Sequence, residues 1–407
     1  MSRALLRERS FRLLWAAQTT SSFGDALTSL TLLLLAHRLT GSTAAVAGTA
    51  IAIALPQLLI GLFAGVMVDR WDRRRLMIAS DLIRAVLVLG FIAVTSADRL
   101  WLLYAIAFAQ AAVGTFFNPA RATLLADVLP SDQLLPANSL SNMSRVVAGV
   151  AGSAAAGVLA SISSSISVVF VIDAFTFVLS AALVARVAVP RLTARQAPTR
   201  MLGELAEGVS LIRNSRILSG VVVAGTMAML GLGAVNVLIV PLVVDDLGSS
   251  EAWFGALEAA MVAAMIGSGA AVAALSGRLE PTHLVTGGAI GLGASVAGFS
   301  LADAPWQLLP LMFAAGACVT PLQSAVTTIL QTTVPPELRG RTQATFATLV
   351  SAANIASMSL AGILAAASGI RGVLVGGGAV VVSAGLLAYA AFRGTATTSP
   401  ATVLDVR

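Results

Sequence analysis

The feature that most constrains this chain is a repeated series of apolar stretches, each about 20 residues long, separated by short polar turns. A helix of about 20 residues is long enough to cross a hydrocarbon core of about 30 Å. Charged residues make up 11% of the 407 residues and hydrophobic residues 57%, whereas soluble domains carry about 25% charged residues. The sequence therefore predicts an all-α membrane protein without a sizeable soluble domain.

Twelve spans are predicted, six in each half of the chain. The first six cover residues 12–38, 44–68, 76–95, 101–122, 138–160 and 165–187, and the second six cover 217–242, 252–275, 283–301, 306–329, 342–367 and 371–392. Residues 1–188 and 217–407 are thus predicted to form two six-helix bundles. The polar segment 189–216 is predicted to be a cytoplasmic linker that contains an amphipathic helix lying on the membrane surface.

Arginine is the only basic residue apart from histidine, and its distribution predicts the orientation of the chain. Of the 25 arginines, 20 fall at the termini and in the turns after even-numbered spans. The positive-inside rule then places both termini in the cytoplasm of a multi-pass protein of the cell membrane. Because these arginines cluster in short turns, we expect the lipid bilayer and not nucleic acid as the partner.

The residues that metal sites and enzymes need are scarce. Cys318 is the only cysteine, His37 and His283 fall at membrane edges, and no metalloprotease, nucleophile-elbow or phosphate-loop motif is present. We therefore expect no cofactor, no metal and no enzyme activity, and the chain is expected to act as a monomer.

The turn after the second span carries the most specific motif. It contains Gly65, then Asp69 and Arg70, and then Asp72 followed by Arg73, Arg74 and Arg75. This motif resembles the cytoplasmic signature of the major facilitator superfamily, with Asp72 where a glycine is usual. The two halves of the chain also correspond to each other, since the stretch from Pro119 to Asn138 has a counterpart from Pro321 to Gln343. These halves are similar to the parallel six-span repeats of that fold.

Further short motifs narrow the resemblance to the macrolide-efflux and enterobactin-exporter branch. These are Gly24-Asp25, Leu39-Thr-Gly-Ser, Asp81 with Arg84, Asn118-Pro-Ala-Arg121 and Ile172-Asp173-Ala174. The resemblance implies secondary active transport by alternating access, with proton-coupled export of a drug, macrolide or siderophore-like compound. Uptake, or flipping of lysophospholipid or another lipid by the same fold, stays open as an alternative because a fold fixes neither direction nor cargo.

Asp69 is predicted to act as a conformational latch. A carboxylate at a span end can accept hydrogen bonds from a helix N-terminus and pair with an arginine. Gly65, Arg70, Arg73, Arg121 and Arg145 are assigned to the same gating role. The alternative is that the charges of this region only anchor the helix ends at the lipid headgroups.

Asp25 is the most informative single residue, because it lies 13 residues from both Arg12 and Arg38, near the middle of the first span. A carboxylate at that depth costs at least about 2.5 to 3.5 kcal/mol unless it faces a cavity, pairs or takes up a proton. We therefore predict that Asp25 couples proton movement to transport and contacts the substrate. A purely structural carboxylate is the alternative.

Other charges are also predicted inside spans: Asp81, Arg84, Arg145, Asp173 and Glu258. Asp173 is predicted to share the proton coupling. Asp81 and Arg84 are three residues apart on one helix face and are expected to pair locally. Structural pairing is the rival interpretation for these residues.

Gln110, Asn236 and Gln323 become substrate contacts by resemblance, since spans 1, 4, 7 and 10 line the cavity in this family. Hydrogen bonding between helices is an equally good account of such amides. Asp25 is compatible with a cationic or neutral substrate, whereas an anionic one would need Arg84, Arg121 or Arg145 in its path.

Overall fold

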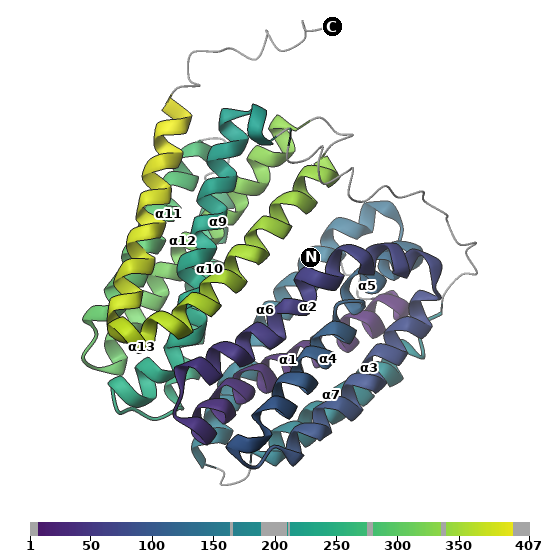
Figure 1. Cartoon of the computed structure of the whole chain (residues 1–407). Helices are drawn as coiled ribbons and strands as arrows, with labels where there is room; N and C mark the ends of the chain where they lie inside the picture. Colours follow the sequence, from purple (N-terminus) through teal and green to yellow (C-terminus); the bar gives the residue numbers. More distant parts are fainter. Residues whose placement is uncertain are drawn as a thin grey trace, which may run out of the picture. The chain divides into compact units, whose positions relative to one another are not determined.

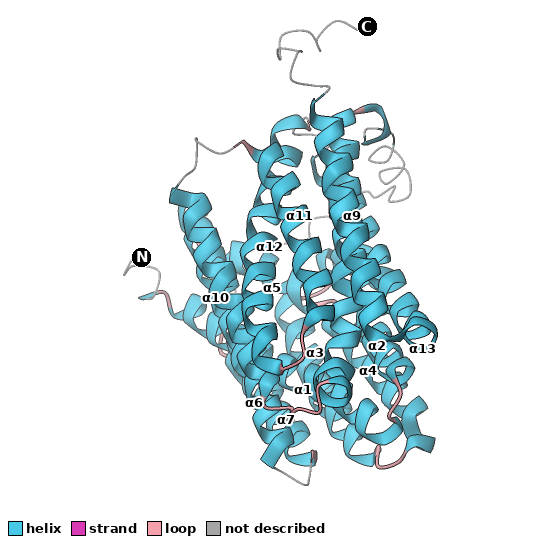
Figure 2. Cartoon of the chain, turned by 90° about the vertical axis from the view of Figure 1, so that its left-hand side faces the viewer, coloured by secondary structure: helices cyan, strands magenta, loops and turns pink. Residues whose placement is uncertain are grey.

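The computed structural model describes residues 7–162, 166–188, 210, 212–274, 280–334 and 339–393. Within these ranges all regular secondary structure is helical (Figures 1 and 2). Most of the predicted linker, including most of its amphipathic helix, lies outside the described residues; residues 210 and 212–214 are helical.

The chain divides into two compact units. Unit 1 comprises Met1–Thr199 and Ile239–Ala259, and unit 2 comprises Arg200–Leu238 and Ala260–Arg407. Each unit is a helical bundle, and unit 1 carries the purple to blue helices of Figure 1. The functional division into bundles 1–188 and 217–407 stays a prediction.

Unit 1 contains seven helices wholly within the described residues: α1 (Arg9–Thr40), α2 (Thr43–Arg70), α3 (Arg73–Gly90), α4 (Leu100–Gly114), α5 (Phe117–Val128), α6 (Ser131–Ile162) and α7 (Ser167–Val184). Helix α1 packs against α6 and α7, and α3 packs against α7. Local sequence sets the helix ends. Gly41 ends α1 at a φ of 61°, where its N–H donates to the carbonyl of His37. The Asp72 carboxylate caps α3 by accepting from the N–H of Arg75.

Unit 2 is built from α9 (Arg216–Pro241), α10 (Trp253–Ala274), α11 (Pro281–Gly298), α12 (Pro305–Thr333) and α13 (Arg339–Arg393). The last residues of α9, the π-helical turn Leu242–Asp246 and the start of α10 belong to unit 1. Helix α11 packs against α12 and α13. Proline begins both α11 and α12, a position where its missing N–H costs no helical hydrogen bond.

Among the described residues, ten helices are long and apolar enough to cross a membrane. Helix α1 is not one of them, although its 32 residues are sufficient in length, because polar residues such as Gln18, Ser21 and Asp25 interrupt its apolar character. The last of the ten, Thr345–Arg393, is divided by Gly369 at a φ of 74°, between the two spans predicted there. The all-α membrane fold is as predicted.

Candidate functional site

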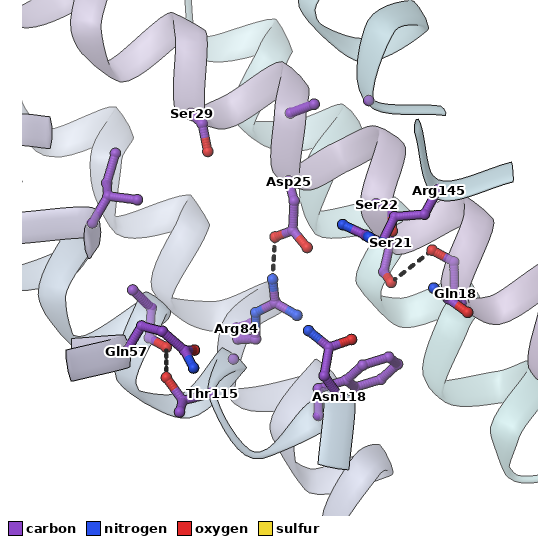
Figure 3. A pocket seen from close by; sticks show the side chains of 16 residues that line it. Gln18, Ser21, Ser22, Asp25, Ser29, Gln57, Arg84, Thr115, Asn118 and Arg145 are labelled. Carbon is purple, nitrogen blue, oxygen red and sulfur yellow. Dashed lines mark hydrogen bonds and ion pairs between the residues drawn. The ribbon is translucent and has the colours of Figure 1, made fainter. Parts of the chain in front are cut away.

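Unit 1 contains a polar cavity of about 380 Å³. Its wall comes from α1, α2, α3, α4, α5 and α6 together with the α4–α5 turn. The polar side chains that line it are Gln18, Ser21, Ser22, Asp25, Ser29, Gln57, Arg84, Thr115, Asn118 and Arg145 (Figure 3). The polar residues that make α1 less apolar than the ten helices counted above therefore lie on the side of α1 that lines the cavity.

Asp25 lies in this wall and pairs with Arg84 of α3. A guanidinium N–H of Arg84 donates to the Asp25 carboxylate, shown as a dashed line in Figure 3. The Asp25 side chain is 41% exposed, whereas that of Arg84 is 7% exposed. The Arg84 guanidinium also stacks 4.1 Å from the centre of the Phe177 ring. Asp25 is therefore paired without being sealed from the cavity.

Two further carboxylates surround Arg84, and both are fully buried. Asp173 of α7 accepts hydrogen bonds from the hydroxyls of Thr28, at 2.5 Å, and Thr176, at 3.0 Å. Asp81 lies 3.8 Å from Nη1 of Arg84, which is an ion-pair distance but too long for a hydrogen bond. The local Asp81–Arg84 pair expected from their spacing therefore forms only loosely, because Arg84 directs its hydrogen bond to Asp25.

The amides assigned to the substrate do not join this group. Gln110 is buried, with 7% of its surface exposed, and only its neighbour Ala111 lines the cavity. Asn236 and Gln323 are exposed residues of unit 2. Their role as substrate contacts stays a prediction.

The signature motif between α2 and α3 is described in part. Gly65, Asp69 and Arg70 lie near the end of α2, where the structure describes the helix but not the side chains. Arg73 forms an ion pair with Asp127 at 2.5 Å, and both side chains are mostly buried. Arg74 donates to the carbonyl of Ala185. These contacts tie the start of α3 to the end of α5 and to the segment after α7.

Arg121 and Arg145 take a different position from Arg73. Arg145 lines the cavity and Arg121 follows Asn118 by three residues on α5. Neither arginine forms an ion pair within the part of the chain that the structure describes. Their assigned gating role stays a prediction.

Sequence reasoning missed the partners of these charges. Asp127, Thr28, Thr176 and Phe177 are common residue types, and nothing in their sequence context marks them as partners. Gly24 carried a signal, since a glycine next to a buried acid indicates close approach of another backbone or side chain.

A second cavity, in unit 2, has a volume of about 340 Å³ and no charged residue in its lining.

Comparison with known proteins agrees with the fold and the motifs. The family model described as "Transmembrane secretion effector", of the major facilitator type, matches residues 2–400. The uncharacterized MFS-type transporter YfiS of Bacillus subtilis is 28% identical, over 95% of this chain and 94% of its own length. Macrolide efflux protein A of Streptococcus pyogenes is 24% identical, over 81% of this chain and 83% of its own.

Among solved structures, a bacterial homolog of the human lysosomal transporter Spinster superposes with a TM-score of 0.78. The two chains are 15% identical, and the match covers 98% of this chain and 100% of the other. A likeness at that identity supports the fold. The match of the family model over nearly the whole sequence shows that the chain belongs to the transmembrane secretion effector family and is a membrane transporter of the major facilitator superfamily.

Proposed function

We propose that this transporter exports a small organic compound from the cell in exchange for protons. The observation that carries the proposal is the Asp25–Arg84 ion pair in the wall of the unit 1 cavity. The efflux activity in the name of the Streptococcus pyogenes relative favours export as the direction. Residues 1–188 and 217–407 would act as the two bundles that rock during alternating access.

The charges around Arg84 support proton coupling. Asp25, Asp81 and Asp173 place three carboxyl groups near one guanidinium, and Asp81 and Asp173 are fully buried. Buried carboxylates in excess of their counter-ions are costly, and uptake of protons removes that cost. Asp25 is the member of this group that is most exposed to the cavity, so it is the point at which a proton from the cavity would be taken up.

Transport should depend on Asp25 in a specific way. Everted membrane vesicles that contain the protein, with a pH-sensitive dye and a compound identified by screening, would report compound uptake and proton release together. We expect Asp25→Asn to lose uptake and proton movement while the protein remains inserted. The matched control Asp98→Asn, at an exposed acid outside the cavity, should transport normally.

The same assay separates the alternatives. Uptake by everted vesicles that stops with a proton uncoupler supports export by antiport. Uptake only by right-side-out vesicles would reverse the proposed direction. Full activity of Asp25→Asn, or transport that is unaffected by the uncoupler, would refute the coupling.

A further inference from the structure

The lining of the unit 1 cavity contains an arginine that pairs with no carboxylate among the described residues. Three ionisable side chains line it: Asp25, Arg84 and Arg145. Arg84 donates a hydrogen bond to Asp25, and the other two carboxylates near Arg84, Asp81 and Asp173, are fully buried and do not line the cavity. Arg145 is exposed and forms no ion pair or hydrogen bond with the residues that the structure describes. Figure 3 shows it among the side chains that face the cavity.

Arg121 is a second arginine that forms no ion pair with the described residues. Arg121 lies on α5, one helical turn after Asn118, which lines the cavity. Its Nε is buried without a hydrogen-bond partner among the described residues. Helix α5 contacts α6, the helix that carries Arg145. Two unpaired guanidinium groups that repel each other would be stabilised by an anion bound between them or beside them.

We propose that the compound bound in this cavity carries a negatively charged group, such as a carboxylate or phosphate, and that Arg145 binds this group with Arg121 close by. This inference rests on the proposed function, since it takes the cavity as the transport site. A guanidinium matches the planar geometry of a carboxylate and can donate two parallel hydrogen bonds to it. Gln18, Ser22 and Asn118 supply uncharged donors and acceptors for the rest of the molecule.

The same walls disfavour a purely cationic compound. Asp25 is the only carboxylate in the lining among the described residues, and it is already paired with Arg84. A cation would have to share Asp25 with Arg84 or displace that arginine. It would also meet the unpaired charge of Arg145.

Equilibrium binding to the purified full-length protein in detergent tests the proposal. The probes share one ring system: 2-naphthoate is the acid, 2-naphthamide the neutral analogue and 2-naphthylmethylamine the cation. We expect the acid to bind more tightly than either analogue. Arg145→Gln should weaken binding of the acid about tenfold or more, because a hydrogen-bonded charge is lost. Arg145→Lys should retain part of the affinity, and Arg99→Gln, at an exposed external arginine, should retain all of it.

An anionic lipid headgroup offers the same chemistry as a soluble acid, so the experiment is repeated in nanodiscs with and without phosphatidylglycerol. Competition by phosphatidylglycerol identifies the lipid headgroup as a ligand of the arginine site, whereas unchanged binding identifies a soluble acid. If the acid does not bind more tightly than both analogues, or if Arg145→Gln binds it like the wild type, the proposal is wrong. No proton gradient is present, so this outcome is independent of proton coupling.

Discussion

Gly24 faces Asp173 at a distance that excludes any side chain. A Cβ at Gly24 would lie 2.0 Å from Oδ1 of Asp173 and 2.2 Å from Oγ1 of Thr176. The Asp173 carboxylate is not free to turn away, because Thr28 donates a 2.5 Å hydrogen bond to its other oxygen. The glycine thus sets how closely α1 approaches α7 and where a buried acid lies.

Replacing Gly24 should therefore disturb the bundle. We expect Gly24→Ala to lower the free energy of unfolding by about 1–3 kcal/mol, the cost of overpacking a well-packed site. Thermal unfolding of the detergent-solubilised protein, followed by tryptophan fluorescence, measures the change. Gly149→Ala is the matched control, since nothing lies within 4 Å of a Cβ there. Equal loss of stability in the two variants would contradict the steric argument.

Arg84 should matter more for stability than Asp25. Loss of Arg84 leaves Asp25, Asp81 and Asp173 without their shared cation, and removing one partner of a buried pair costs about 3–5 kcal/mol. Asp25→Asn removes a half-exposed acid and leaves Arg84 near the other two. We expect Arg84→Gln to lower the unfolding temperature more than Asp25→Asn does. The reverse order would mean that Arg84 is not the central counter-ion.

The Arg73–Asp127 pair should hold together the end of unit 1 where α3 starts and α5 ends. A double-mutant cycle with Arg73→Ala and Asp127→Ala should give a coupling energy of about 0.5–3 kcal/mol in thermal or chemical unfolding. Exchange of the two charges in one protein should restore part of the stability lost in each single variant. Arg75→Ala, whose side chain is 88% exposed, should have little effect. A coupling energy of zero would leave Arg73 as a headgroup anchor only.

A contact at the opposite end of α1 is also testable. Arg38 donates from Nε to Oε1 of Glu251 at 2.8 Å and from Nη2 to the carbonyl of Ala160 at 2.6 Å. The Arg38 side chain is partly exposed, so we expect Glu251→Gln to cost only about 1 kcal/mol. The same unfolding measurement should show no loss for Glu280→Gln, a more exposed acid. Loss that is no greater than in this control would show that the Arg38–Glu251 pair contributes nothing.

The spans were predictable because each must bury an apolar surface in lipid and satisfy its own backbone, which leaves a strong local pattern. Asp25 was predictable for the same reason, since a lone acid in such a stretch is conspicuous. Its partner was not: the spacing of Asp81 and Arg84, three residues apart on the same helix, predicted a local pair between these two. Packing of both α1 and α3 against α7 decided in favour of Asp25 and brought Asp173 beside them.

Gln110 shows a feature that the sequence does not fix, namely which side of a helix faces the cavity. Gln110 lies on the predicted cavity helix, yet its side chain is buried beside the cavity and Ala111 faces it. Successive residues of a helix point about 100° apart around its axis, so the rotation of the helix decides whether Gln110 or Ala111 faces the cavity. Hydropathy does not fix this rotation when both faces of the helix are apolar.

Sequence alone determined the membrane class, the approximate spans, the predicted orientation and the presence of an acid at mid-depth, because solvation by lipid acts on each segment separately. Tertiary structure decided which charges neutralise one another and which remain open to the cavity. Pairing depends on the rotation and depth of several helices at once, and residues as distant in sequence as Asp25, Arg84 and Arg145 acquire their roles only when those helices pack.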